Sequence, residues 1–515
     1  MSNIGASILE TARQSPDQPA LWVRGETLTF GELVVRAGAL AQLLEQHSIG
    51  VDDRVAIISE RTETAYAGVL AALLNGSAYV PLNPRFPAKR NRAILEQSGA
   101  RALICSEGQK NTLQEICDGL PDLELILLPE SAEPSPAACK QINADQVKPV
   151  ALDHPFGCEN GAGDLAYLLF TSGSTGVPKG VPITHDNVLA YLRGIRSVSR
   201  ISPDARVIQL VDLTFDISVH DMFIAWTSGA CLFCVPENAT LLASRFVEEH
   251  SISHWFSVPS TAALIKNAGL LEPQSMPSLR YTYFCGEALT GAVAEAWSIA
   301  APNSVVLNLY GPTEATVAFS AFLYQAGQAN PPPVVPLGHA FPEQQMALFT
   351  YEGKYAGDGP GEICLSGSQV ASGYWNAPQL TAKQFFKADD KRWYRTGDLG
   401  RYLPVEGFAY LGRVDRQVKI RGYRIELQEV EAAVRRVTQC DLAAVLPWPI
   451  DASGSALGCI AFVVGSAKAG ALERCRELLP DYGVPSHITE LDEMPLNANG
   501  KVDYPALAAR ARRGN

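Results

Sequence analysis

At 515 residues, the chain exceeds the size at which one hydrophobic core stops growing, so the sequence predicts at least two domains. Its 47% apolar and 19% charged residues are typical of a globular protein, and its net charge of −12 argues against nucleic acid as a partner, since a phosphate backbone needs a basic face. No apolar run reaches membrane-spanning length and no signal-peptide pattern opens the chain, so we expect a cytoplasmic protein with no membrane partner.

The first predicted elements are those of an alternating α/β fold. Thr29 and Glu32 form a capping box, in which each side chain satisfies a free N–H group at the start of a helix that runs to Gln46. Strands are then predicted at 55–58, 78–82 and 102–105, with helices at 64–74 and 88–97 between them. Successive βαβ units predict a doubly wound parallel sheet with helices on both faces.

The alternation resumes after a stretch, 129–164, that is rich in Pro, Ala, Gly, Asn and Asp and predicts a surface connection. Strands separated by helical segments are predicted at 207–211, 230–235, 252–258, 279–285 and 305–309, which indicates a second doubly wound half. In such sheets ligands bind beyond the carboxyl ends of the strands. The segments that follow these strands are therefore candidates for a site.

Two smaller units are predicted after this half. Short strand-like pieces broken by glycine turns over 331–412 predict a small antiparallel sheet or β-barrel. The segment 415–515 contains predicted strands at 418–420, 442–446 and 460–464 and a helix at 428–437, which indicate a compact α+β unit. The expected fold class is α/β, with an N-terminal core over 1–414 and a C-terminal lid over 415–515 that is hinged at Asp415.

The 11 cysteines are odd in number, and several lie inside apolar, strand-like runs, as Cys105 does at the end of 102–105. This distribution is not that of a disulfide framework. Cys231 and Cys234 have the spacing of a zinc half-site, but no second cysteine pair or histidine pair follows them. We therefore expect reduced thiols, with two buried cysteines on the strand at 230–235.

A glycine- and hydroxyl-rich loop follows a buried strand predicted at 166–170. In the run Thr171-Ser172-Gly173-Ser174-Thr175-Gly176, glycines allow backbone N–H groups to line one concavity, and hydroxyl groups add further donors. Lys179 adds a mobile positive charge. The loop therefore predicts an anion site, with a plain turn between a strand and a helix as the alternative. It is not an ordinary P-loop, because Pro178 precedes the lysine and Gly180 follows it.

Two further glycine turns end predicted strands of the second half. After 305–309 comes Tyr310-Gly311-Pro312-Thr313-Glu314, where an aromatic face can stack on a base, a hydroxyl can bind a phosphate and a carboxylate can hold Mg²⁺. The run Cys285-Gly286-Glu287-Ala288 ends another strand, and its bare backbone can approach an adenine ring. A plain turn explains the glycines but not the whole set.

Together, these turns and the Thr171 loop resemble the motifs of the adenylate-forming superfamily, which contains acyl-CoA ligases, firefly luciferase and the adenylation domains of nonribosomal peptide synthetases. The stretches 395–398, 412–422 and 497–503 resemble its later motifs in the expected order. The resemblance implies ATP and Mg²⁺ as cofactors, Thr313, Glu314 and Lys501 as catalytic residues, and Glu314 as the metal ligand. It implies a nucleotide site formed by Thr171, Ser172, Gly173, Ser174, Thr175, Gly176, Lys179, Gly286, Glu287, Ala288, Asn308, Tyr310, Gly311, Asp398 and Arg413.

The same resemblance implies that Asp398 binds the ribose hydroxyls and that the lid works in two orientations. In one orientation, Lys501 reaches from the lid into the site. In the other, rotation about Asp415 withdraws Lys501 and brings the loop around 419–422 forward to line a passage for a thiol. One small site cannot accommodate both groups at once.

The stretch 215–223 resembles the amino-acid-activating branch, in which the carboxylate at Asp216 binds the α-ammonium group of the substrate. A simple helix N-cap is the alternative for Asp216, and a packing role is the alternative for His220. With a neutral His220 the implied pocket has no other charge, which predicts a small amino acid (proline, threonine, serine or alanine), and its mainly apolar wall favours proline. The implied pocket residues are Asp216, Ile217, His220, Ser257, Tyr283, Cys285, Leu309, Val317 and Ala318.

The sequence therefore predicts an amino acid adenylating ligase that forms aminoacyl-AMP and transfers the aminoacyl group to a phosphopantetheine thiol. No carrier segment follows Lys501, so we expect a stand-alone monomer that loads a separate carrier protein. One alternative is an acyl- or aryl-CoA ligase, which would show no preference for an amine. Another is a nucleotide-binding pseudoenzyme, which should have lost Lys501, Glu314 or Asp398, but all three are present.

Overall fold

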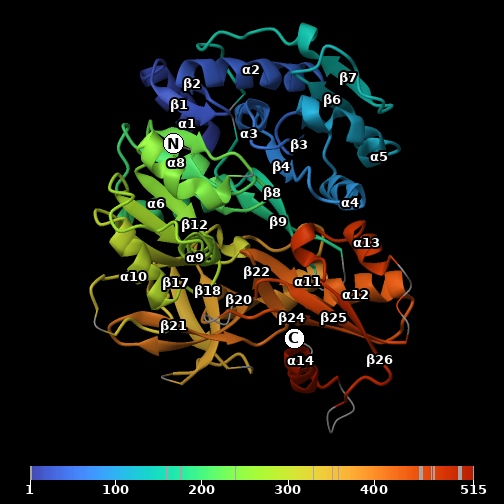
Figure 1. Cartoon of the computed structure of the whole chain (residues 1–515). Coiled ribbons are helices and arrows are strands. Elements are labelled where there is room, and N and C mark those ends of the chain that lie inside the picture. The colour runs from blue at the N-terminus through green and yellow to red at the C-terminus, as the bar shows by residue number, and fades with distance from the viewer. Residues whose placement is uncertain are drawn as a thin grey trace.

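Two large β-sheets, with helices between and around them, form most of the chain, and smaller β-containing parts follow (Figure 1). The computed structural model describes residues 3–157, 160–173, 177–237, 239–328, 330–350, 352–357, 359–451, 456–465, 467, 470–496 and 502–513. Over these ranges, no helix is long and apolar enough to cross a membrane. The ten cysteines that they include are free, and Cys231 and Cys234 are buried on one strand.

The first large sheet has seven strands in the order β7-β6-β5-β3-β4-β8-β9, and all its neighbours are parallel except the β8–β9 hairpin. The predicted elements between residues 54 and 105 occur within one residue of their expected bounds, and the capping box at Thr29 and Glu32 is present. The strands are β3 (Arg54–Ile58), β4 (Ala78–Leu82), β5 (Ala102–Cys105), β6 (Leu125–Leu128), β7 (Lys140–Asn143), β8 (Leu165–Thr171) and β9 (Lys179–Thr184). The accompanying helices are α2 (Phe30–Gln46), α3 (Glu63–Asn75), α4 (Ala88–Ser98) and α5 (Leu113–Cys117).

The segment 129–164 is not only a surface connection, as the sequence had suggested. It contains β7, which adds an edge strand to the first sheet by pairing in parallel with β6. The strand is short and mainly polar, with only Ile142 buried, so it lacks the apolar run by which the other strands are found.

The second large sheet has nine strands in the order β16-β15-β14-β13-β12-β10-β11-β1-β2. The five strands predicted between 207 and 309 lie side by side in parallel, within two residues of their expected bounds. At one end of the sheet β1 continues the parallel pairing and β2 is antiparallel to it, and at the other end β15 and β16 pair antiparallel. Its members are β1 (Pro19–Val23), β2 (Glu26–Thr29), β10 (Arg206–Gln209), β11 (Cys231–Cys234), β12 (His254–Ser257), β13 (Tyr281–Phe284), β14 (Val305–Tyr310), β15 (Ser320–Leu323) and β16 (His339–Ala340). The accompanying helices are α1 (Ile4–Gln14), α6 (His185–Val198), α7 (Ile217–Trp226), α8 (Ala243–His250), α9 (Pro259–Asn267) and α10 (Gly291–Ala300).

The main core lies between the two large sheets. It joins residues of both sheets with residues of α2, α3, α6 and α7. The helix α3 is buried at 12 of its 13 positions, which explains why its sequence has no polar face. Because helices fill the space between the sheets, the carboxyl ends of strands from both sheets can contribute to one site.

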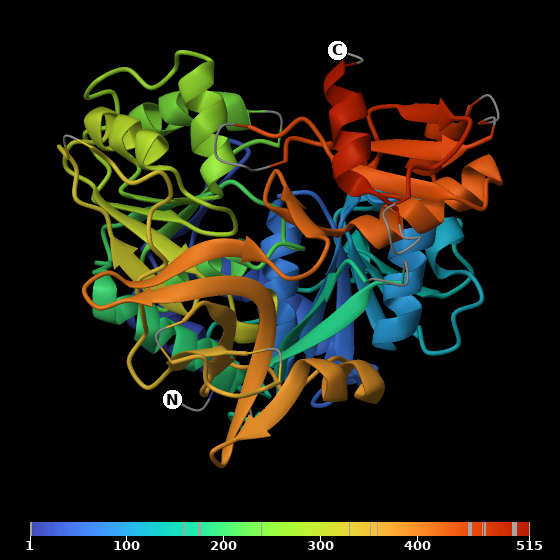
Figure 2. The same cartoon turned by 90° about the horizontal axis from the view of Figure 1, so that it is seen from below.

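The segment predicted as a small antiparallel sheet or barrel forms a five-stranded antiparallel sheet. The 13-residue strand β20 pairs with β19 along its first part and with β21 along its second, and Figure 2 shows it curving between the two. The strands are β17 (Gln345–Phe349), β18 (Gly361–Ser366), β19 (Phe385–Ala388), β20 (Lys391–Leu403) and β21 (Gly407–Arg413), with α11 (Pro378–Gln384) beside them.

The C-terminal part begins with a two-stranded hairpin and continues with a three-stranded sheet. Two clusters of buried side chains, both formed within this part, lie on its α12 and α14 sides. The helices α12 and α13 lie beside α4 of the first half (Figure 1), where Arg90 and Glu429 form a buried ion pair of 2.7 Å. The elements are β22 (Gln417–Ile420), β23 (Tyr423–Glu426), α12 (Leu427–Thr438), β24 (Ala443–Pro447), β25 (Cys459–Val464), α13 (Ala471–Arg476), β26 (Ile488–Leu491) and α14 (Tyr504–Arg513).

Candidate active site

The glycine-rich loop joins the strands β8 and β9, so it connects two strands and is not the strand-to-helix turn that was the alternative. Thr171 pairs with Lys179 across the hairpin, which brings the two ends of the loop together. A Cβ atom on Gly173 would lie 2.1 Å from the Val177 carbonyl oxygen, so only glycine fits there. The hydroxyl of Thr171 is buried without a hydrogen-bond partner in the described part of the chain, as expected for a donor to a ligand. Ser174, Thr175 and Gly176 lie outside the described residues.

Glu314 lies in a short 3-10 turn, η4 (Thr313–Ala315), directly after β14. Its carboxylate is fully buried and accepts hydrogen bonds from Tyr374 Oη (2.7 Å) and from Arg424 Nη1 (2.9 and 3.2 Å), while Lys179 Nζ lies 3.6 Å away. Burial would raise the pKa of Glu314, but Arg424 and Lys179 outweigh it and lower the pKa to about 2. Burial and the nearby Arg424 lower the pKa of Lys179 to about 8. The carboxylate is therefore ionised and faces two cations at neutral pH.

Asp398 is held between a tyrosine and an arginine. It accepts hydrogen bonds from Tyr310 Oη (2.8 Å) and Arg413 Nη1 (2.5 Å), and it is 6% exposed. Arg413 also binds both carboxylate oxygens of Asp415, at 2.7 and 2.8 Å. Arg413 thus connects two other residues predicted for the nucleotide site, Asp398 and Tyr310, to the predicted hinge at Asp415.

Asp216 lines a cavity of about 50 Å³ that also contacts the Tyr310 and Asp398 cluster. It occupies the N-cap position of α7, but its side chain makes no capping hydrogen bond, which counts against the N-cap alternative. Burial raises the pKa of Asp216 to about 6, although a hydrogen bond from Thr313 and the charge of Lys419 oppose the rise. A buried carboxylate of this kind favours a bound cation.

Buried rings stand behind this cavity. His220 Nδ1 lies 2.6 Å from Tyr191 Oη, and the His220 ring makes edge contacts with Phe256 and Tyr283 at centroid distances of 4.8 and 5.0 Å. Burial and the neighbouring His254 lower the pKa of His220 to about 3, so this histidine is neutral. These contacts favour the packing role that was the alternative for His220.

The predicted pocket residues divide into two groups. Asp216, Ile217, Cys285 and Val317 line the cavity. The other five are buried but are not among its lining residues, and Ser257 Oγ accepts a hydrogen bond from Trp255 Nε1 and donates one to the Val258 carbonyl. These five are His220, Ser257, Tyr283, Leu309 and Ala318.

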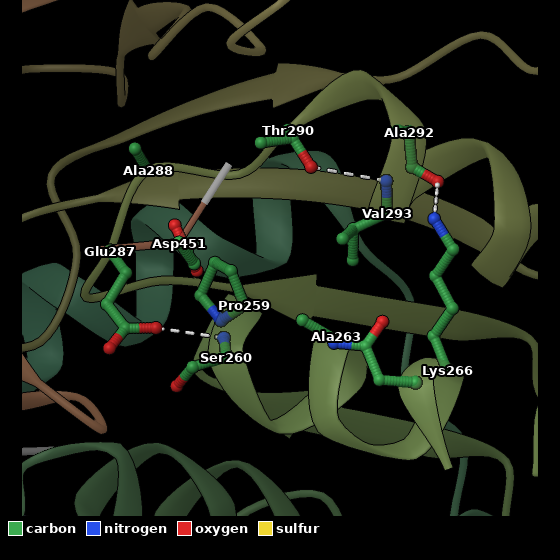
Figure 3. A pocket seen from close by; sticks show the side chains of 11 residues that line it. Pro259, Ser260, Ala263, Lys266, Glu287, Ala288, Thr290, Ala292, Val293 and Asp451 are labelled. Carbon is green, nitrogen blue, oxygen red and sulfur yellow. Dashed lines mark hydrogen bonds between the residues drawn. The ribbon is translucent and has the colours of Figure 1, made fainter. Parts of the chain in front are cut away.

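Four residues predicted to bind the nucleotide lie in three different places. Gly286, with φ of 94°, lines the cavity beside Asp216 and Tyr310. Glu287 and Ala288 line a separate pocket of about 170 Å³ between α9 and α10 (Figure 3). In that view Glu287 accepts a hydrogen bond from the Ser260 backbone N–H at 2.8 Å. Asn308 lies away from both pockets and donates to the carbonyl groups of residues 335 and 336.

The hairpin β22–β23 of the C-terminal part faces this site. Gly422 N–H donates to Glu287 Oε1 at 2.6 Å, Tyr423 Oη donates to Asp212 at 3.0 Å, and Lys419 lines the cavity of Asp216. The resemblance implied such a position of this loop in the second of the two lid orientations. Lys501, which was assigned to the first orientation, lies outside the described residues.

Two residues that contact Glu314 were not predicted. Arg424 lies on β23, two positions after Gly422 of the hairpin turn, so continuing the period-two alternation back into the turn could have placed both on the side toward the site. Tyr374 lies between the strands β18 and β19 in a stretch without a recognisable spacing to any motif. No local pattern in the sequence identifies it.

Comparison with known proteins identifies the family of the chain. A protein-family model described as AMP-binding enzyme matches residues 8–375. Tyrocidine synthase 2 and tyrocidine synthase 3, both from Brevibacillus parabrevis, are each 33% identical over 97% of this chain. The chain spans 13% and 7% of the length of these two proteins.

Solved structures resemble the whole chain. The crystal structure of the Vibrio cholerae adenylation domain AlmE in complex with glycyl-adenosine-5'-phosphate has 34% sequence identity and a TM-score of 0.90, with 100% of this chain and 98% of that chain covered. The o-succinylbenzoate CoA synthetase of Bacillus subtilis, at 21% identity and a TM-score of 0.81, shares the fold. The fold and the matches define an AMP-binding enzyme with the fold of an adenylation domain. The chain belongs to the family of AMP-binding enzymes, the adenylate-forming superfamily that its motifs resemble.

Proposed function

We propose that this chain uses ATP and Mg²⁺ to convert a small α-amino acid into aminoacyl-AMP and then transfers the aminoacyl group to the phosphopantetheine thiol of a carrier protein. The observation that carries the proposal is the buried carboxylate of Asp216, which lines one cavity together with Tyr310, Thr313 and Asp398. A substrate ammonium group would supply the charge that balances this carboxylate. A fatty or aryl acid would leave the carboxylate buried without such a partner.

The residues present fit both ATP and Mg²⁺. Thr171 offers a buried hydroxyl without a partner among the described residues, and Gly286 offers backbone without a side chain. Glu314 offers an ionised oxygen ligand, the kind that Mg²⁺ prefers. When bound, Mg²⁺ would neutralise charge on the phosphate groups of ATP. Asp398 and Tyr310 would bind the ribose.

In the first step, Asp216 would hold the ammonium group so that the substrate carboxylate points at the α-phosphorus. A carboxylate oxygen forms a bond to this phosphorus while the bond to the bridging oxygen of pyrophosphate breaks. We assign Lys501 to the charge that develops on the attacked phosphate. In the second step, the thiol sulfur attacks the carbonyl carbon, loses its proton and displaces AMP.

We also propose that 1–414 and 415–515 move as two units about Asp415. The residue lies between β21 and β22, and Arg413 binds its carboxylate from the preceding strand. The hairpin β22–β23 at the site supports an assignment of the present arrangement to the thiol-transfer step. Carrier-protein binding and the hinge motion are parts of the same proposal.

Replacing Asp415 by Pro should reduce thioester formation more than adenylation, because proline fixes φ at the position that must rotate between the two steps. Pyrophosphate exchange would measure adenylation, and single-turnover loading of a purified carrier protein would measure transfer. Asp415→Ala is the matched control, since it also loses the contact with Arg413 but leaves φ free. Equal losses in both half-reactions of Asp415→Pro would contradict the hinge assignment.

The rings behind the cavity set an upper limit to the substrate's side chain. Tyr283, His220 and Phe256 are almost fully buried and pack against one another, so they cannot move aside without opening a cavity in the core. These rings carry no charge, so a charged side chain that points at them would have no partner. We therefore propose a substrate among proline, threonine, serine, alanine and glycine, where glycine is added because AlmE binds a glycyl adenylate.

A panel of the twenty amino acids in a pyrophosphate-exchange assay tests this function. We expect one of the five small amino acids to be the best substrate, with lysine, arginine, glutamate and tryptophan near background. Tyr283→Ala should extend activity to a larger apolar amino acid, because it removes a ring from behind the cavity. A charged or indole side chain as the best substrate of the wild type would contradict the pocket assignment. Equal activity with propionate or benzoate would favour the CoA ligase alternative.

A further inference from the structure

The carboxylate that the proposed function assigns to the metal is occupied by a residue of the C-terminal hairpin. Arg424 Nη1 lies 2.9 Å from Oε2 and 3.2 Å from Oε1 of Glu314. Tyr374 Oη donates to Oε1 at 2.7 Å. Both carboxylate oxygens are therefore engaged, and the strongest contact comes from a part of the chain that belongs to the lid.

The backbone fixes where this guanidinium lies. The backbone carbonyl of Arg424 accepts a hydrogen bond of 2.5 Å from Ser172 Oγ. The side-chain Nε of Arg424 donates a hydrogen bond of 2.7 Å to Oε1 of Gln417, which lies on the neighbouring strand. Two residues earlier, Gly422 N–H is bound to Glu287. A Cβ atom on Gly422 would lie 2.4 Å from Val258, so the hairpin approaches the body as closely as its backbone allows. Arg424 cannot leave Glu314 by a small shift while the hairpin stays docked.

Charge prevents a metal ion from binding Glu314 while Arg424 is in contact with this carboxylate. Glu314 carries one negative charge, and Arg424 and Lys179 both face it. A divalent cation on the same carboxylate would lie within a few ångströms of two positive groups in a buried environment, where their repulsion is poorly screened. The coordination sphere of Mg²⁺ also demands open space around its oxygen ligand, which the guanidinium fills.

We propose that Arg424 and the metal ion compete for Glu314: the guanidinium replaces the metal when the hairpin β22–β23 docks, and it leaves the carboxylate when the metal enters with the nucleotide. This inference rests on the proposed function for its metal and its nucleotide. It makes Arg424 a positioning residue that links the position of the lid to the metal content of the site. The metal and pyrophosphate must then leave before the hairpin can dock, and the transfer step proceeds without a metal on Glu314.

Binding of Mn²⁺ with α,β-methylene-ATP, measured by electron paramagnetic resonance on the whole chain, tests the proposal without turnover. Removing the competitor by Arg424→Gln should tighten binding of the metal–nucleotide complex at least about tenfold, the equivalent of one hydrogen bond to a charged group. Arg421→Gln, which changes an exposed arginine of the same hairpin, should bind as the wild type does. The gain should disappear in Arg424→Gln combined with Glu314→Gln, because the contested carboxylate is then absent.

Two results would contradict the proposed competition between Arg424 and the metal ion. One is equal metal–nucleotide affinity in the wild type and Arg424→Gln, and the other is a gain that survives the loss of Glu314. AMP binding in EDTA separates this failure from a failure of the proposed function, since a chain that binds no AMP is not the proposed enzyme. As a second measurement, wild-type enzyme should load a carrier from preformed aminoacyl-AMP equally well in EDTA, and a requirement for Mg²⁺ there would also count against the proposal.

Discussion

Replacing Asp216 by Asn should raise the amino acid concentration needed for half-maximal pyrophosphate exchange about a hundredfold, because removal of one partner of a buried charge pair leaves the other uncompensated. The change keeps the size of the side chain, so the fold and the cavity should persist. The comparison of alanine with propionate supplies the control. Wild type should strongly prefer the amine, and the variant should lose most of that preference. An unchanged preference would remove the ammonium role from Asp216.

Asp216 also predicts that the apparent affinity for the amino acid depends on pH. The pKa of Asp216 is raised to about 6 by burial, so the carboxyl group is protonated below that pH in the free enzyme. An ammonium group pairs with the ionised form, and the apparent affinity should therefore fall about tenfold for each unit below pH 6. Asp216→Asn should lack this slope. A slope of the same size in the variant would assign it to another group.

Loss of the lysine at position 501 should slow adenylation about a hundredfold, the usual cost of removing one donor that stabilises charge in a transition state. Transfer of the aminoacyl group from preformed aminoacyl-AMP should change little in Lys501→Ala. The reason is that Lys419 and Gly422 of the hairpin contact the site in the present arrangement, which we propose to be that of the transfer step. Pyrophosphate exchange and single-turnover carrier loading measure the two steps separately. Exchange at the wild-type rate would contradict the role of Lys501.

The sequence predicted most of the parallel strands of both halves well, because they are short apolar runs bounded by turn residues, as at Ala102–Cys105. It did not predict β6, although this strand is an apolar run, nor β7, which is polar, nor the hairpin β1–β2, whose strand β1 pairs with the distant β11. Local patterns cannot report a pairing between residues that lie two hundred positions apart. The strands were therefore found more reliably than their order in the sheets.

The residues of the candidate site were also predicted only in part. Motif residues such as Glu314 and Asp216 follow strand ends, Asp398 lies within β20, and the structure brings them to one region. Tyr374 and Arg424, the partners of Glu314, were not predicted, because they come from segments that meet the site only in three dimensions. The roles of Asn308 and His220 could not be judged from sequence, since both depend on which neighbours accept or donate their hydrogen bonds.

The position of the hairpin β1–β2 has a consequence for how the chain folds. Leu21 pairs with Leu232 and Trp22 with Phe233, so β1 meets its partner β11 only after more than two hundred further residues have emerged from the ribosome. Until then the edge of β1 that pairs with β11 has no partner, and contacts between residues so far apart in the chain form slowly. The two α/β halves are therefore not two consecutive folding units. A cut between the two sheets would leave the second without its edge strands, and the N-terminal residues complete a structure that the chain starts to build much later.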